Sequence, residues 1–240
     1  MATFVLVHGA WHGGWCWSRV SPKLLALGHN VFTPTLTGFG ERSHLLSPEI
    51  GLETNIVDIE NVIRWEDLSE VILVAASYAG MVTTCVADRM PERIAALIYQ
   101  NAFIASDGVS QNDLLPEWRK VMIEENIEDA WCMPPPDPKL FGVEDCNDQK
   151  WIRSKMTPQA AKTFRDKAHL TGAHSAITNR TYIRATGYPN ETFDRYLNEA
   201  KSDPNWRAEV LNTSHDAMIT LPSDIVRICT EVSDSIEHRV

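Results

Sequence analysis

A serine stands directly after a buried apolar run, VILVAA at residues 71–76, and before a stretch with helical spacing. Ser77 would therefore lie on a sharp strand-to-helix turn, which holds its hydroxyl clear of the strand so that a carbonyl can approach. Such turns usually carry glycine two residues before and two residues after the serine, whereas this chain has Ala75 and Ala79. The hexapeptide AASYAG thus indicates a candidate nucleophile, which still needs a base to take its proton.

Two further segments could complete an acyl-transfer site. His215 lies in NTSHDAMITLP, between the last predicted strand and the last predicted helix, and imidazole is the commonest general base. The loop HGAWHGGW, residues 8–15, follows the first buried strand and can present a backbone N–H to a developing oxyanion. Tyr78, the residue after the serine, would supply a second N–H.

The apolar pattern predicts a scaffold that can bring these segments together. Short apolar runs alternate with amphipathic stretches, as in parallel strands joined by helical crossovers, and ligands of such α/β sheets bind at the carboxyl ends of the strands. The predicted strands span residues 3–8, 30–36, 70–75, 94–100, 180–186 and 206–211. The predicted helices span residues 18–27, 52–65, 79–90, 191–201 and 222–237.

The strand rhythm is interrupted once, between about residues 107 and 178. This segment contains the run Pro134-Pro135-Pro136, several tryptophans and a mostly helical, polar periodicity. We interpret it as an inserted cap, residues 107–178, on a single core formed by residues 1–106 and 179–240. A chain of 240 residues is the usual size for one such domain.

The composition excludes several classes of function. With 22 Lys and Arg against 32 Asp and Glu, the net charge of −10 disfavours nucleic acid and anionic lipid as partners. No apolar run approaches the roughly 20 residues that span a bilayer. Five cysteines without CxxC spacing predict neither a disulfide framework nor a zinc site. We expect a cytoplasmic protein without metal or cofactor that acts on a small-molecule substrate, and we leave a homodimer open.

Four motifs resemble one known family. The opening HGAWHGGWCW, the loop GFGERSHL at residues 38–45, the helix start SYAGM and the ending SHDAMITLP are similar to the α/β-hydrolase superfamily. They resemble in particular its small branch of plant methylesterases and hydroxynitrile lyases with their bacterial esterase relatives. The resemblance implies the α/β-hydrolase fold, a mostly parallel sheet flanked by helices with a small cap. It also implies Ser77 as nucleophile, His215 as base, and the N–H groups of Ala10 and Tyr78 as oxyanion hole.

The acid that orients the histidine in such enzymes is missing from both of its usual positions. One position falls on Tyr188, and the other, at the end of the strand that follows the nucleophile helix, falls on Asn101. An amide can hold an imidazole tautomer but cannot stabilise an imidazolium, and Asp→Asn in a serine triad costs about 10⁴ in rate. We predict Asn101 as the orienting group, and the nearby carboxylates remain alternatives: Glu191, Asp194 and Asp107.

Other residues near these motifs receive weaker predictions. His12, in the first loop, is placed among the substrate-contacting residues. Trp131 of the cap is a second candidate for the substrate pocket, with a packing role as its alternative. Asp216, directly after the histidine, is expected to be solvated, and His8 is expected to be structural.

Three functions remain open from the sequence. The first is a serine hydrolase that cleaves a small ester, lactone or amide through an acyl-enzyme. The second is a lyase that uses Ser77 and His215 for proton transfer. Hydroxynitrile lyases carry threonine and lysine where this chain has Gly9 and Asp216, which counts against cyanohydrin cleavage. The third is a diverged ligand-binding protein without turnover, as the uncharged acid positions and Asn55, a usual histidine position in relatives, would suggest.

Overall fold

A six-stranded parallel sheet forms the centre of the molecule. The computed structural model describes residues 1–125, 127, 129 and 131–237. The strands are β1 (Thr3–Val7), β2 (Asn30–Phe32), β3 (Val71–Ala76), β4 (Ile94–Gln100), β7 (Arg180–Ala185) and β8 (Trp206–Leu211). They follow the order β2-β1-β3-β4-β7-β8, and every neighbouring pair is parallel. The predicted α/β sheet is confirmed. β2 stops at Phe32 instead of residue 36, and Pro34, which has no N–H to donate, lies in the lost part.

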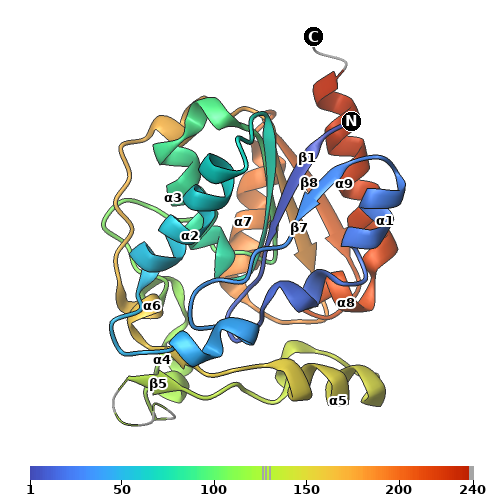
Figure 1. Cartoon of the computed structure of the whole chain (residues 1–240). Coiled ribbons are helices and arrows are strands. Elements are labelled where there is room, and N and C mark those ends of the chain that lie inside the picture. Colours follow the sequence, from blue (N-terminus) through green and yellow to red (C-terminus); the bar gives the residue numbers. More distant parts are fainter. Residues whose placement is uncertain (126, 128, 130, 238–240) are drawn as a thin grey trace.

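Helices cover both faces of this sheet (Figure 1). α1 and α9 lie on one face, while α2, α3 and α7 lie on the other. Their bounds are α1 (Ser21–Ala26), α2 (Leu52–Trp65), α3 (Ala79–Arg89), α7 (Glu191–Ser202), α8 (Ala217–Thr220) and α9 (Pro222–Glu237). α2 packs through Ile56, Ile59 and Ile63, which the 3.6-residue period places on one side. α3 is buried along almost its whole length, so it fixes the turn that precedes it.

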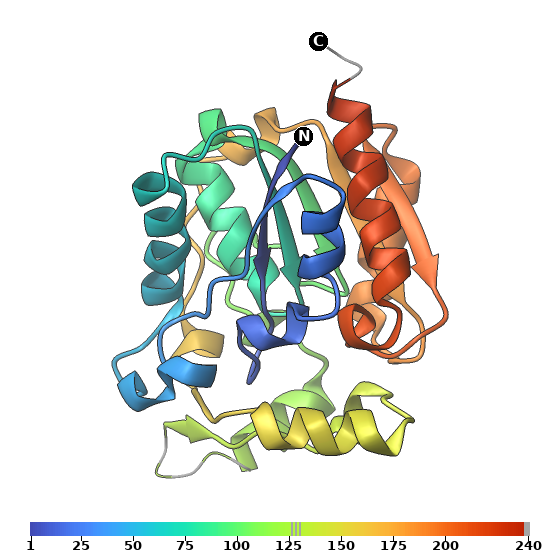
Figure 2. The same ribbon diagram turned by 45° about the vertical axis from the view of Figure 1, so that its right-hand side comes forward.

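The segment between β4 and β7 lies across the carboxyl ends of the strands (Figure 2). It contains α4 (Glu117–Glu125), β5 (Cys132–Met133), η5 (Pro138–Phe141), α5 (Cys146–Lys155), β6 (Gln159–Ala160), α6 (Lys162–Arg165) and η6 (Ala173–Ala176). We keep the name cap for residues 107–178. The last part of the cap returns along α2 and α3, where Asp88 of α3 accepts hydrogen bonds from the N–H groups of Thr171, Gly172 and His174.

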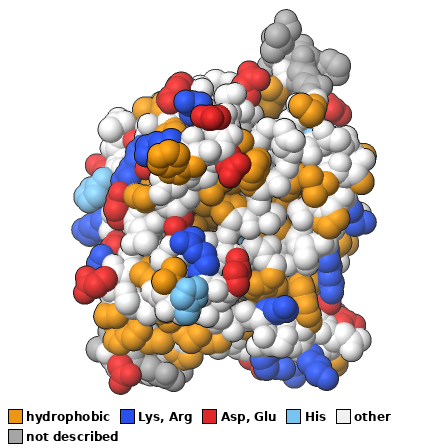
Figure 3. Space-filling view, viewed as in Figure 1, with side chains coloured by type: hydrophobic (Ala, Val, Ile, Leu, Met, Phe, Trp, Pro, Cys, Tyr) orange, Lys and Arg blue, Asp and Glu red, His pale blue; other side chains and the backbone are white. Residues whose placement is uncertain are grey.

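One part of the surface is rich in hydrophobic side chains. Hydrophobic side chains gather on the lower part of the face in Figure 3, over the cap. Trp118 and Val121 of α4 are among the exposed large hydrophobic residues. Among the described residues, no helix combines the length and apolar composition needed to cross a bilayer. No group of three or more potential metal ligands occurs in that part of the chain either.

Candidate active site

Ser77 occupies a strained turn between β3 and α3. Its φ of 54° lies in the left-handed region, which non-glycine residues rarely adopt outside functional sites. Its N–H donates to the Gln100 carbonyl at 3.2 Å, and its carbonyl accepts from the Phe103 N–H at 3.1 Å. Ala75 and Ala79, which replace the usual glycines, are both buried and leave the turn intact. The predicted strand-to-helix turn is therefore present despite the alanines.

The first loop lies directly against this turn. A Cβ built on Gly9 would stand 2.9 Å from the Cβ of Ser77, so glycine is needed there for the close approach. In the described part of the chain, the N–H groups of Ala10 and Tyr78 donate no hydrogen bond, as an oxyanion hole requires. The Tyr78 ring is buried elsewhere, with its hydroxyl donating to Asn55 at 2.8 Å, so only its backbone can serve the site.

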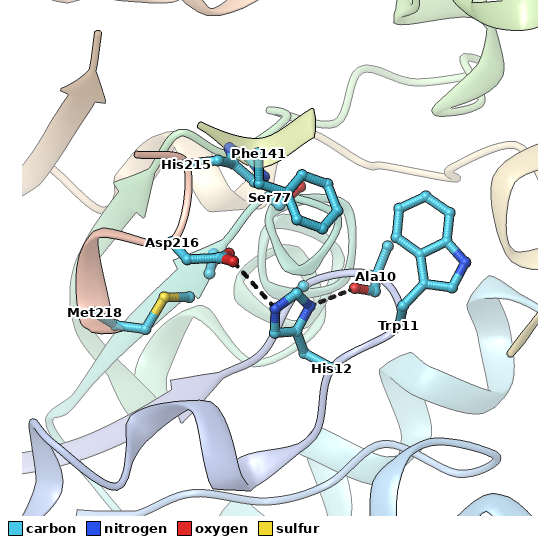
Figure 4. A pocket seen from close by; sticks show the side chains of 10 residues that line it. Ala10, Trp11, His12, Ser77, Phe141, His215, Asp216 and Met218 are labelled. Atoms are coloured by element: carbon cyan, nitrogen blue, oxygen red, sulfur yellow. Dashed lines mark hydrogen bonds and ion pairs between the residues drawn. The ribbon is translucent and has the colours of Figure 1, made fainter. Parts of the chain in front are cut away.

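His215 and Ser77 line one small cavity of about 10 Å³, with room for a single water molecule (Figure 4). No hydrogen bond joins the two side chains in the described structure. The His215 ring is 6% exposed and packs against Tyr188, with ring centroids 4.5 Å apart, and parallel to Phe193 at 5.8 Å. Burial lowers the pKa of His215 to about 3, so the imidazole is neutral at physiological pH.

Asn101 is the polar side chain that contacts the Nδ1 edge of this imidazole. Its Oδ1 accepts the Ala185 N–H at 2.8 Å and lies 3.3 Å from the Arg184 guanidinium. These two donors fix the amide orientation, because a flipped amide would leave the buried Ala185 N–H without an acceptor. Nδ2 therefore faces His215 Nδ1, at 3.3 Å. It follows that Nδ1 accepts and that Nε2 carries the hydrogen in the resting state.

The alternative carboxylates do not reach the histidine. Asp194 pairs with the Arg184 guanidinium at 2.7 Å, and Asp107 accepts a backbone N–H in the cap at 2.9 Å. Glu191 is exposed in the first turn of α7. None of the three makes a hydrogen bond or ion pair with His215 in the described structure. The structure thus gives no support to these alternatives, and an amide occupies the position of the orienting acid.

The expectation that Asp216 is solvated is wrong. The residue is only 2% exposed, and it lines the Ser77 cavity opposite His12. Its Oδ2 lies 3.4 Å from His12 Nε2, while His12 Nδ1 donates to the Ala10 carbonyl at 2.7 Å (Figure 4). Burial alone would lower the pKa of His12, but the Asp216 carboxylate and that carbonyl outweigh it and raise the pKa. The two residues form a buried ion pair beside the candidate nucleophile.

The tryptophan that lines the cavities is Trp11, for which we made no prediction, and not Trp131. Trp131 is partly buried, and its carbonyl accepts the Ala161 N–H, but it lines neither the Ser77 cavity nor the neighbouring cap cavity. Trp11 lines both cavities and has a φ of 61°. Its N–H donates to Gln159 Oε1 at 3.1 Å and its Nε1 to the Met133 carbonyl at 3.2 Å. These bonds tie the first loop to the cap.

Two buried histidines should make the fold acid-sensitive. Burial lowers the pKa of His8 and His215 to about 3 from the ordinary 6.5, so below pH 6 the unfolded chain binds protons that the folded chain does not. We expect the free energy of unfolding in urea to fall by up to about 1.4 kcal/mol per pH unit for each histidine between pH 6 and 4.5. His12 is protonated in both states there and adds no slope.

The matched variant is His8→Gln, because His8 Nε2 accepts the Leu36 N–H at 3.0 Å and a glutamine oxygen can replace that acceptor. The variant should lose about half of the slope. A free energy of unfolding that stays constant over this pH range would contradict the assignment of both histidines as neutral.

Comparisons with known proteins identify the family to which this fold belongs. The sequence profile of the alpha/beta hydrolase family matches residues 4–227. A carbendazim hydrolyzing esterase from Nocardioides sp. (strain SG-4G) is 37% identical over 235 residues, which cover 94% of this chain and 97% of that protein. Methyl jasmonate esterase 1 of Vitis vinifera is 25% identical over 265 residues, with 97% of both chains covered. An extracellular alpha/beta-hydrolase from a Paenibacillus species superposes with a TM-score of 0.85 at 22% identity, over 97% of this chain and 99% of that chain. The chain therefore belongs to the alpha/beta hydrolase family.

Proposed function

We propose that the protein is an ester-hydrolysing enzyme that cleaves a small carboxylic ester, lactone or amide through an acyl-enzyme on Ser77. The observation that carries this proposal is the meeting of three groups at one cavity: the strained Ser77, the neutral imidazole of His215 and Ala10 of the first loop. The N–H groups of Ala10 and of Tyr78, the residue after the serine, donate no hydrogen bond within the described residues. The names of the two aligned relatives, both esterases, support an ester as the substrate.

The proposed reaction requires a change of tautomer. With Asn101 donating to Nδ1, the hydrogen sits on Nε2, which then cannot accept the serine proton. The hydrogen must first move to Nδ1, where it faces the Asn101 Nδ2 donor and loses the hydrogen bond between them. Ser77 Oγ then attacks the carbonyl carbon and its proton passes to Nε2. The oxyanion is held by the Ala10 and Tyr78 N–H groups, and the imidazolium proton goes to the departing alkoxide. Water then repeats these steps on the acyl-enzyme and releases the acid.

Asp216 is proposed to supply the negative charge that the orienting position lacks. It follows His215 in the chain and lines the same cavity. Burial lowers the pKa of that imidazole, and three cations lower it further, while the Asp216 carboxylate offsets part of this lowering. In a buried site, such a charge acts more strongly than it would in water on an imidazolium that forms during reaction. His12 holds the carboxylate in place through the ion pair.

The fixed tautomer favours one second candidate, a protein that binds an ester without turning it over. A fluorophosphonate probe distinguishes the two. We expect mass spectrometry to locate the adduct on Ser77, with no adduct on the Ser77→Ala variant and full labelling of Ser154→Ala, which removes an exposed serine of the cap. With p-nitrophenyl acetate, an acyl burst should precede steady turnover. Absence of labelling at every pH between 5 and 9 would favour the binding protein, and turnover without an acyl intermediate would favour a lyase.

A further inference from the structure

A second cavity lies within the cap, next to the Ser77 cavity. Its volume is about 270 Å³, and its walls are mostly apolar, formed by Ile123, Met133, Leu140 and residues 134–136. Trp11 lines both cavities, so the two share a wall. The Ser77 cavity itself holds only one water molecule. The cap cavity is the neighbouring space with room for the body of a substrate, and we assign the substrate body to it with the ester group at Ser77.

One cation among the described residues faces this apolar space, and no counter-ion for it occurs in that part of the chain. The Arg119 guanidinium lines the cap cavity, and within the described residues it makes no hydrogen bond or ion pair. It contacts two aromatic rings instead, with Cζ 5.6 Å from the centroid of Trp118 and 4.8 Å from that of Tyr188. Asp137 also lines the cavity, but Arg153 pairs with it at 2.8 Å. Burial lowers the pKa of Arg119 to about 10, which leaves the group charged at pH 7.

We propose that the cap cavity binds the carboxylate of an ester substrate and that Arg119 is the residue that selects it. The Arg119 guanidinium is partly buried and has lost hydration that none of the described protein groups replaces. A carboxylate is its best geometric match because the two can form paired hydrogen bonds. The substrate would then be a monoester of a dicarboxylic acid, with its ester carbonyl at Ser77. This inference rests on the proposed function for the ester end of the molecule.

The position of Arg119 links such a carboxylate to the catalytic base. Tyr188 contacts both the Arg119 guanidinium and the His215 ring. The charge of Arg119, together with His12 and Arg184, disfavours protonation of that imidazole. A carboxylate bound to Arg119 would cancel part of this positive field. The bound substrate would therefore contribute negative charge close to a base that has no acid partner.

Calorimetric binding to the Ser77→Ala variant tests the inference without depending on turnover. The ligands are the monomethyl esters of succinic, glutaric, adipic and suberic acid, each compared with the methyl alkanoate that carries methyl in place of the carboxylate. We expect one chain length to bind about 10- to 100-fold more tightly than its neutral counterpart, the range for a charge-assisted hydrogen-bonded pair. Adding Arg119→Met should remove this preference, and Arg119→Lys should keep part of it.

The matched control is Lys120→Met, which removes a cation from the same helix that pairs with Glu117 instead of facing the cavity. It should leave the preference unchanged. In the enzyme with Ser77 intact, Arg119→Met should raise KM for the carboxylated ester and leave KM for the neutral ester within about 3-fold. Equal binding of charged and neutral esters at every length, or a preference that survives Arg119→Met, would overturn the inference. Loss of Ser77 labelling with retained Arg119-dependent binding would instead reject only the proposed hydrolysis.

Discussion

The Asn101→Asp variant is expected to hydrolyse esters faster than the wild-type chain, by about 10²- to 10³-fold in kcat. A carboxylate at this position accepts from His215 Nδ1, so the hydrogen moves to Nδ1 and Nε2 becomes free for the serine proton. The negative charge also stabilises the imidazolium. Arg184, 3.3 Å from the present Oδ1, can pair with the new carboxylate. Stopped-flow and steady-state rates with p-nitrophenyl acetate measure the change.

The gain should stay below the full factor of about 10⁴ known for an aspartate in a serine triad. The present Nδ2 donates to the Ala185 carbonyl at 3.0 Å, and a carboxylate oxygen there would lose this bond and repel that carbonyl. We expect the free energy of unfolding to fall by about 1–3 kcal/mol for this reason. Asn101→Leu, which removes the amide donor without adding charge, is the control and should change kcat less than 10-fold. An unchanged or lower rate in a folded Asn101→Asp protein would contradict the proposed roles of Asn101 and His215.

The Asp216→Asn variant is expected to lose about 10²-fold in kcat, a typical effect of removing one electrostatic group from a closed site. The carboxylate is the described negative charge that raises the pKa of His215, while Arg119, His12 and Arg184 act in the opposite direction. Without it, the imidazolium formed by proton transfer from the serine has no nearby counter-charge. Pre-steady-state acylation rates isolate this step from deacylation.

The His12→Gln variant distinguishes an electrostatic role of Asp216 from a purely structural role of its ion pair with His12. This variant breaks the same ion pair but keeps the carboxylate and removes a cation. The pKa of His215 should therefore rise. In the wild type we expect the acid limb of kcat/KM far below pH 6 because this pKa is lowered, and in the variant the limb should move to higher pH. Acylation should not fall as it does in Asp216→Asn. If both variants lose activity equally with no shift of the pH profile, the ion pair serves packing alone.

The architecture was predictable because its signals are local. Strands β1, β3 and β4 are short apolar runs, and the isoleucine spacing of residues 52–65 predicted both the helix and its buried side. The turn at Ser77 was recognisable from small residues next to an apolar strand, although glycine was absent. β2 was predicted too long because the apolar pattern continues past Pro34, which cannot take part in the strand pairing.

The electrostatics of the site were not predictable, because they depend on contacts between distant segments. Asn101 could be placed near His215 from its position after a strand, but the direction of its amide is set by Ala185, 84 residues away. Asp216 is buried because it pairs with His12 of the first loop. The sequence does not show this pairing, and a carboxylate beside a polar motif usually faces water. The only hint in the sequence was that Asp216 precedes the buried stretch of α8.

The hydrogen bonds of Trp11 also bear on how the substrate range of this scaffold could change. Trp11 is adjacent to Ala10 in the chain, and it donates hydrogen bonds to Gln159 of β6 and to the Met133 carbonyl of β5. A displacement of the β5–β6 pair would therefore shift the first loop, with the Ala10 N–H, as well. Laboratory evolution towards bulkier esters should therefore enrich substitutions in the proline-rich stretch 134–136, which forms cavity wall without anchoring the loop. Gln159, although remote from the reacting atoms in sequence, should resist replacement in every active descendant.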